Sequence, residues 1–425
     1  MPREQASFPI NDFDVFKRQM LNWANRFNIC CFLDNHNYTH TPNRYQCLLA
    51  VDAIDTFRVP VSNPGTMQAL QQFLQQHNDW LFGHFNFDFG HPSHLPDTIG
   101  FPDAFLFQPA TVIELQQHTV HISCYHHTPE QVFRVISAET PASAQSPAIT
   151  PAFTPRISQA DYIAKIQALQ KHILRGDCYE INFCQEFYAA SAQLNPLATY
   201  LRLAAASPAP FAAYYKTGEH HLLCASPERY VYREAQTLLS QPIKGTARRD
   251  TTNVHADELL RQQLFNSSKD RSENVMVVDL VRNDFSRLCL PGSVHVQELF
   301  GVYSFPQVHQ LISTITGTLP SQATFAAILE ATFPMGSMTG APKQKVLELT
   351  SRYETVKRGI YSGTVGYIKP GGDFDFNVVI RSLLYNAQTQ YLSYLVGGGI
   401  TFYSDAAKEY EECLLKAAGI KKALL

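Results

Sequence analysis

Residues 242–246 read Pro242-Ile243-Lys244-Gly245-Thr246, and this run is the most informative stretch of the chain. A lysine beside a glycine means little by itself. Here the run is the second of five motifs that follow one another: Ser226-Pro227-Glu228, residues 242–246, residues 273–280 (ENVMVVDL), Gly340-Ala341-Pro342-Lys343 and Gly397-Gly398-Gly399. The order and the spacing of the five motifs make the signal specific.

The segments around these motifs mix helical and extended patterns. Residues 159–175 carry apolar side chains at helical spacing, and Gly176-Asp177 ends that pattern. Residues 270–288 and 405–422 are also predicted helices. Extended runs are predicted at 179–183, 211–215, 362–368, 376–384 and 391–396. Because helices and strands do not alternate strictly, the pattern favours an α+β fold over a doubly wound sheet.

A proline-rich segment divides the chain. Prolines 141, 147, 151 and 155 lie within residues 138–156, where they prevent helix and remove sheet donors, so we expect an exposed connector. It separates an N-terminal region, residues 1–137, from residues 157–425, which hold the motifs. In the first region, residues 66–77 have a helical pattern, and residues 85–89 alternate apolar and polar side chains, which predicts a strand.

Composition excludes several classes of protein. The chain of 425 residues is 45% hydrophobic and 17% charged, as in globular proteins. Its net charge is −3 and no block of lysine or arginine is present, which argues against binding to nucleic acid. No apolar run is long enough for a membrane span, and the first residues show no secretory pattern. The nine cysteines include no CxxC pair, and we expect buried free thiols in a reducing cytoplasm.

In this order, the five motifs resemble those of the chorismate-utilising enzymes, over most of residues 157–425. The Pro-Ile-Lys-Gly-Thr form is similar to that of the aminodeoxychorismate synthase branch (component I), whereas the anthranilate synthase branch usually has alanine where Lys244 stands. The resemblance implies an α+β fold in which two large, mostly antiparallel sheets pack face to face with helices outside. Residues 1–137 would then be the N-terminal region of this sandwich and residues 157–425 the chorismate-binding catalytic region.

Two pairs of acids are candidates for a metal site. Asp270 and Glu273, like Glu409 and Glu412, are spaced i,i+3 on predicted helices, so each pair lies on one helix face. Such a spacing is also common on solvated faces. Magnesium prefers hard oxygen ligands, and the resemblance places metal-associated acids at these four positions, which implies Mg2+ as the cofactor.

Glu228 and Lys244 are the candidate catalytic residues. Glu228 fits a surface turn as well as a general acid that protonates a leaving hydroxyl, and the resemblance implies the second role. Lys244 fits a surface cation or a nucleophile. As a nucleophile it must be neutral, and an ordinary lysine is neutral in only roughly one molecule in 2,500 at pH 7. We therefore expect burial to depress the pKa of Lys244, with no acid raising it.

The remaining candidates would bind substrate. Residues 397–399 could turn backbone N–H groups toward a carboxylate, or be a plain flexible turn. Arg381 could grip a carboxylate with two hydrogen bonds. His309 alone is more often a core histidine. The resemblance implies substrate contacts for Ser337 and Tyr361, and we keep His309 as a residue that lines the site. The full set of expected substrate-binding residues is Thr246, His309, Ser337, Tyr361, Arg381, Gly397, Gly398 and Gly399.

The resemblance implies amination of chorismate at C4 by ammonia, giving 4-amino-4-deoxychorismate on the way to para-aminobenzoate and folate. Glu180 stands where isochorismate synthases carry a basic lysine, which argues against addition of water. No Gly-x-Cys-x-Gly motif of a glutaminase is present, so a separate glutamine amidotransferase subunit is expected to supply ammonia. The alternatives are an anthranilate synthase component I and a non-catalytic paralogue that binds chorismate or a partner.

Overall fold

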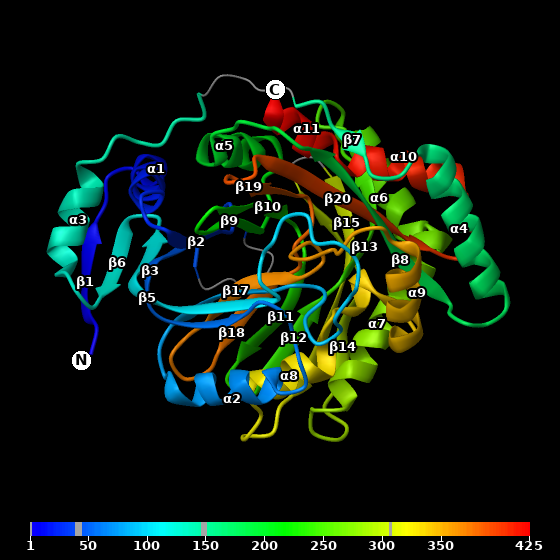
Figure 1. Cartoon of the computed structure of the whole chain (residues 1–425), viewed down its shortest axis with the longest axis horizontal. Coiled ribbons are helices and arrows are strands. Elements are labelled where there is room, and N and C mark those ends of the chain that lie inside the picture. The colour runs from blue at the N-terminus through cyan, green and yellow to red at the C-terminus, as the bar shows by residue number, and fades with distance from the viewer. Residues whose placement is uncertain (1, 39–44, 146–150, 306–307) are drawn as a thin grey trace.

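The computed structural model describes residues 2–38, 45–145, 151–305 and 308–425. The strands in these ranges join into one hydrogen-bonded sheet of twenty strands, and the pairings between them are antiparallel. The sheet folds back on itself, so that two halves face each other with helices on their outer surfaces (Figure 1).

The first half of the sheet begins at an edge strand and ends at β4. Its order follows from the pairings, with β12 and β13 placed one after the other along β15: β14 (His295–Ser304), β15 (Val308–Thr318), β12 (Thr237–Gln241) with β13 (Ile243–Arg248), β11 (Arg229–Glu234), β18 (Phe374–Asn377), β17 (Thr364–Ile368) and β4 (Leu81–Phe85).

The second half continues from β4 to β8. Its strands are, in order, β5 (Ala104–Gln116), β3 (Cys47–Val59), β2 (Ile29–Asp34), β9 (Phe211–Thr217), β10 (His220–Ser226), β19 (Ser382–Asn386), β20 (Tyr391–Ile400) and β8 (Glu180–Ala189). Four further strands extend it at β5 and β8: β6 (Thr119–Cys124), β1 (Glu4–Pro9), β7 (Thr154–Pro155) and β16 (Gly340–Ala341).

Apolar side chains from both halves form the core between the layers, among them Phe82, Phe107, Tyr215, Val365 and Leu384. The first half is covered outside by α2 (Thr66–Gln76), α7 (Ser268–Ser286) and α8 (Phe325–Thr332). The second half is covered by α1 (Phe13–Ala24), α3 (Pro129–Ser137), α4 (Gln159–Leu174), α5 (Pro196–Ala206), α9 (Lys343–Tyr353), α10 (Ala406–Lys416) and α11 (Ala418–Leu424). The predicted α+β sandwich is confirmed, with its two sheets joined into one.

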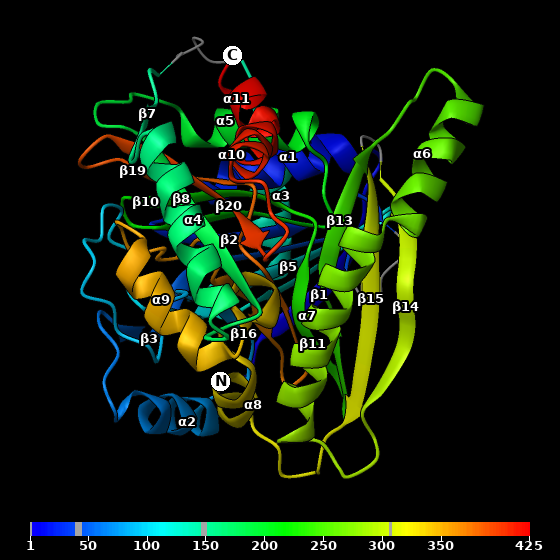
Figure 2. The same cartoon turned by 90° about the vertical axis from the view of Figure 1, so that its right-hand side faces the viewer.

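The remaining helix, α6 (Val254–Asn266), packs with α7 against β13, β14 and β15 (Figure 2). Both helices begin at side-chain caps. Asn253 accepts hydrogen bonds from the first turn of α6, and Ser267 accepts one from the Asp270 N–H at the start of α7. The cap at Ser267 fixes where α7 begins, and therefore places Asp270 and Glu273 in its first two turns.

Two predicted strands differ from the structure. Only Phe85 of the alternating run 85–89 lies in a strand, because the polar members of the run are buried too: Asn86 donates to the Phe101 carbonyl, and Asp88 accepts from the Gly359 N–H. The run 376–384 is split between β18 and β19. Arg381, at φ +51, interrupts the extended backbone between them.

The predicted segments 1–137 and 157–425 contribute to the same sheet, through the pairings β2–β9 and β4–β17. Part of the predicted connector 138–156 lies outside the described residues, and Thr154 and Pro155 at its end pair with β8. No helix in the described ranges is both long and apolar enough to cross a membrane. All nine cysteines are free and buried, as predicted.

Candidate active site

Lys244 lies on β13, where the first half of the sheet approaches β8 of the second half. The β13–β15 register shifts between Ile243 and Thr246, so the strand is irregular at Lys244. The Lys244 Nζ donates a hydrogen bond of 2.7 Å to Oε1 of Glu180, the first residue of β8. Both side chains are largely buried, with 11% and 3% of their surfaces exposed. The amine is therefore held between the two halves of the sandwich.

The acids around Lys244 overturn one expectation. Burial alone would lower the pKa of Lys244, but the carboxylates of Glu180 and Glu273, together with Glu228, raise it above its ordinary value. The prediction of a depressed pKa was wrong, because the sequence does not show which acids the fold gathers around the amine. In this state of the site Lys244 is an ammonium.

Glu228 follows β10 and is 2% exposed. Burial raises the pKa of Glu228 to about 7, against smaller opposing effects of the Ser337 hydroxyl, the charge of Lys244 and the Ile243 N–H. A carboxyl group with this pKa is about half protonated at neutral pH and can deliver a proton there. This environment suits a group that donates a proton near neutral pH.

Residues 397–399 lie inside β20, paired with β8, and do not form a turn. Their importance is steric. A Cβ at Gly399 would lie 2.4 Å from Glu180 Oε1 and 2.9 Å from Lys244 Nζ, and one at Gly397 would lie 2.4 Å from Cys184 Sγ. A Cβ at Gly398 would approach Glu409 Oε2 to 3.1 Å. Glycine at these positions lets the charged side chains come close to the strand.

One acid of each predicted pair, Glu273 on α7 and Glu409 on α10, lies beside Lys269. The Lys269 ammonium lies 3.8 Å from Glu273 Oε1 and 3.5 Å from Glu409 Oε1, so these two acids flank one cation. The side chain of Asp270 lies against Gly245, and Glu412 pairs with Lys416 at 2.9 Å. The helices α7 and α10 therefore direct carboxylates toward the space beside Lys244.

Oxygen donors suited to a divalent cation are present here. Oε1 of Glu273 is buried and has no hydrogen bond. Burial raises the pKa of Glu273 to about 7, and Lys244 opposes that shift. In the described ranges, no three carboxylate, histidine or cysteine side chains are grouped closely enough to hold a metal ion, and Lys269 lies between the acids. The donors fit Mg2+ chemically, provided that Lys269 moves aside.

Three other candidates lie around Glu228 and β20. Ser337, in the short 3-10 helix η1 (Gly336–Met338), hydrogen-bonds the Glu228 carboxyl group. Arg381 is close enough to Glu228 for its charge to favour the ionised carboxylate. Tyr361 is buried next to Cys184, which itself lies against Gly397. The structure thus brings these three residues to the region of Glu228 and the glycine strand.

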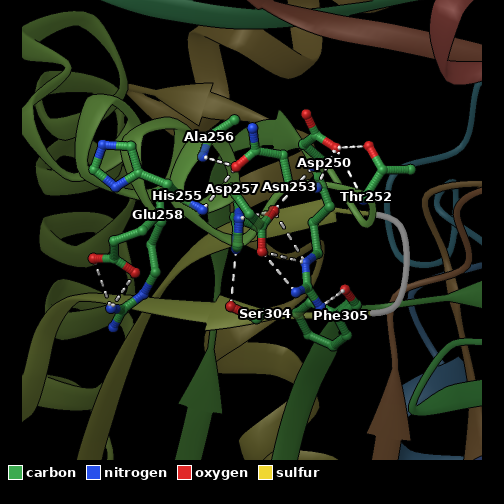
Figure 3. A network of polar contacts seen from close by, with 12 residues as sticks. Asp250, Thr252, Asn253, His255, Ala256, Asp257, Glu258, Ser304 and Phe305 are labelled. Atoms are coloured by element: carbon green, nitrogen blue, oxygen red, sulfur yellow. Dashed lines mark hydrogen bonds and ion pairs between the residues drawn. The ribbon is translucent and has the colours of Figure 1, made fainter.

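His309 belongs to a different network, that of Asp257 and Ser304, two residues labelled in Figure 3. Its Nε2 lies 3.0 Å from Asp257 on α6, and its Nδ1 lies 2.9 Å from the Ser304 hydroxyl. Asp257 is also bound by the Arg249 guanidinium. Both ring nitrogens are used inside the protein, and the structure does not bring His309 to Lys244.

The residue after His309 was missed from the sequence. Side chains alternate along a strand, so Gln310 lies on the face of β15 opposite His309, the face shared with its cross-strand partner Thr246. Gln310 is buried, and neither atom of its amide has a hydrogen bond. Thr246 itself is exposed. An unpaired amide beside Thr246 is a candidate ligand for substrate, and no motif in the sequence points to it.

With this geometry established, comparison with known proteins identifies the family. A model of the chorismate binding enzymes matches residues 30–422. The chain belongs to this family. Aminodeoxychorismate synthase component 1 of Klebsiella aerogenes is 36% identical over 78% of the chain and 74% of its own length. The protein of the same name in Escherichia coli is 34% identical over 84% and 82%.

Solved structures of an anthranilate synthase component I and of an isochorismate synthase share the fold. Anthranilate synthase component I from Streptococcus pneumoniae superposes with a TM-score of 0.76, covering 90% of this chain and 93% of its own, at 24% sequence identity. At that identity the likeness concerns the fold alone.

Proposed function

We propose that this chorismate-binding enzyme aminates chorismate at C4 with ammonia, giving 4-amino-4-deoxychorismate, the precursor of para-aminobenzoate and folate. The observation that carries the proposal is that two groups lie at one site: Lys244, a buried amine, and Glu228, a buried acid whose pKa is raised to about 7. The relatives named aminodeoxychorismate synthase component 1, which match most of the chain, support it.

The chemistry assigned to these residues is a double displacement. Glu228 protonates the C4 hydroxyl, which leaves as water, while the Lys244 amine adds at C2 and the ring double bond shifts. Ammonia then adds at C4, the double bond shifts back, and Lys244 leaves C2. Two displacements explain how an amine replaces a hydroxyl at the same carbon. Hydroxide is a poor leaving group, which is why the acid is needed.

We propose Mg2+ as the cofactor, held by Glu273 and Glu409 with Asp270 and Glu412 near it. The ion would bind substrate carboxylate and neutralise its charge. The buried Oε1 of Glu273, which has no hydrogen bond, supports the assignment. The Lys269 ammonium occupies the space between the acids and would have to leave it.

Replacing Glu273 with glutamine is expected to weaken binding of Mg2+ by about tenfold or more, because a charged oxygen ligand is lost. Calorimetric titration of the purified chain with MgCl2, with and without chorismate, would measure this. Glu348→Gln is the matched control, since Glu348 is an exposed acid of α9 paired with Lys345. Equal affinities in the wild type and Glu273→Gln would rule out Glu273 as a ligand.

We further propose that ammonia comes from a glutamine amidotransferase subunit, because the sequence carries no glutaminase motif and the relatives are named as component 1. The nine buried free thiols support a reducing compartment, the cytoplasm.

The purified chain, given chorismate, Mg2+ and an ammonium salt, is expected to form aminodeoxychorismate, and to form none with glutamine. Mass spectrometry of the products tests both statements. Anthranilate with pyruvate would indicate the other branch of the family, and unchanged chorismate would indicate a binding paralogue. Synthesis from glutamine without a partner would contradict the two-subunit proposal.

A further inference from the structure

Glu180 makes the closest polar contact of Lys244. Its Oε1 accepts the 2.7 Å hydrogen bond from Nζ, and the carboxylate is buried at the start of β8. Its other oxygen, Oε2, is buried without a hydrogen bond. The glycine at 399 keeps this pair intact, because a Cβ there would collide with both partners. A buried carboxylate whose main contact is one amine is suited to act on that amine.

The surroundings of Lys244 create a need for such a partner. Facing it are Glu180 on β8, Glu273 on α7, Glu228 after β10 and, further away, Glu412 on α10. These acids hold the proton on Nζ, yet Nζ must lose it before its lone pair can form a bond. Release to solvent is the unfavourable route, whereas transfer along an existing hydrogen bond turns two buried charges into two neutral groups.

We propose that Glu180 is the base that takes the proton from Lys244 as its amine adds to the substrate, an inference that rests on the proposed function. The pair is already in hydrogen-bond contact, so no rearrangement is required.

The steps balance in protons and electrons. The proton moves from Nζ to Glu180 and the Nζ lone pair forms the C2–N bond. The ring π electrons shift toward C4, and the C4–O bond breaks with a proton from Glu228, releasing water. In the second displacement ammonia adds at C4, the C2–N bond returns its electrons to Nζ, and Nζ recovers the proton from Glu180. The new C4 ammonium returns one proton to Glu228. The sum is chorismate plus ammonia giving aminodeoxychorismate plus water.

The test measures formation of the Lys244 adduct without ammonia, so that the protonation of ammonia does not affect the measured rate. Wild type, Glu180→Gln and Glu180→Asp are mixed with chorismate and Mg2+, quenched in acid, and the peptide containing Lys244 is weighed. At pH 7 the Glu180→Gln enzyme is expected to form the adduct about 100-fold more slowly. Glu180→Asp, which keeps a carboxylate, is expected to recover part of the rate.

The pH dependence of adduct formation shows whether Glu180 acts as a base or only holds the Lys244 amine in place. In Glu180→Gln the amine must lose its proton to solvent, so the ratio of wild-type to variant rate should shrink as pH rises from 6 toward 9. Titration of Glu228 affects both enzymes and cancels in the ratio. A ratio that stays constant would show that Glu180 only positions Lys244, and a variant as fast as the wild type would show that it only restrains the amine. Either result overturns the proposal.

The products and the adduct formed by the wild-type enzyme distinguish failure of the Glu180 assignment from failure of the proposed function. A wild-type enzyme that makes no aminodeoxychorismate refutes the function itself. One that makes the product without any Lys244 adduct refutes the covalent route, and the role of Glu180 with it. Product and adduct in the wild type, with unchanged rates in Glu180→Gln, refute the assignment of Glu180 alone.

Discussion

Lys244→Ala is expected to slow formation of aminodeoxychorismate by about three orders of magnitude or more, because the covalent route to C4 is lost with the amine. The space left beside C2 should also admit ammonia, so a trace of C2-aminated product is expected. Product analysis by mass spectrometry with saturating ammonium measures both changes. In the wild type, borohydride or acid quenching should leave a substrate-derived mass on the peptide that contains Lys244.

Lys345→Ala is the matched control, since Lys345 is a partly exposed lysine of α9 paired with Glu348. It should retain normal synthesis. If Lys244→Ala kept near-normal amination at C4 and the wild type gave no adduct, Lys244 would be an electrostatic clamp. The distinction from the anthranilate synthase branch would then lose its main support.

Glu228→Gln is expected to lower kcat by about 100- to 10,000-fold, the usual contribution of a general acid. Glutamine has the same shape but cannot donate the proton. Since burial raises the pKa of Glu228 to about 7, and the acid form is the active one, kcat/KM of the wild type should be full below that pKa and fall as pH rises through it. The profile should be recorded at constant free ammonia.

Glu114→Gln offers a matched control, because burial also raises the pKa of this half-buried acid of β5, which lies outside the site. It should leave both rate and pH profile unchanged. A Glu228→Gln enzyme that still shows the fall near pH 7 would assign that titration to another group.

Local elements were predictable from the sequence because their signals are local. The helices expected at 159–175 and 66–77 appear as α4 and α2, within a residue of the predicted ends, since caps and apolar periodicity act within a few turns. The sandwich itself came from the resemblance of the motifs. Periodicity cannot tell which strands pair, and β8 pairs with β20, more than two hundred residues later in the chain.

The electrostatics of the site could not be predicted for the same reason. The pKa of Lys244 depends on acids at 180, 228 and 273, which only the fold brings together. The sequence also does not show which of two neighbouring strand residues faces the site. To decide between His309 and Gln310 one needs the register of β15 against β13. The glycines at 397–399 suggested a turn, but close packing against Glu180, Lys244 and Cys184 explains them better.

The Lys244–Glu180 contact joins β13, near one end of the strand order, to β8 at the other. These strands are not hydrogen-bonded neighbours, so the length of this side-chain ion pair depends on the distance between the two layers of the sandwich. A displacement of about 1 Å between layers would barely disturb the core, yet it is enough to cost an enzyme about a hundredfold in rate. Turnover is therefore expected to respond to a change in layer spacing that leaves the free energy of global unfolding nearly unchanged.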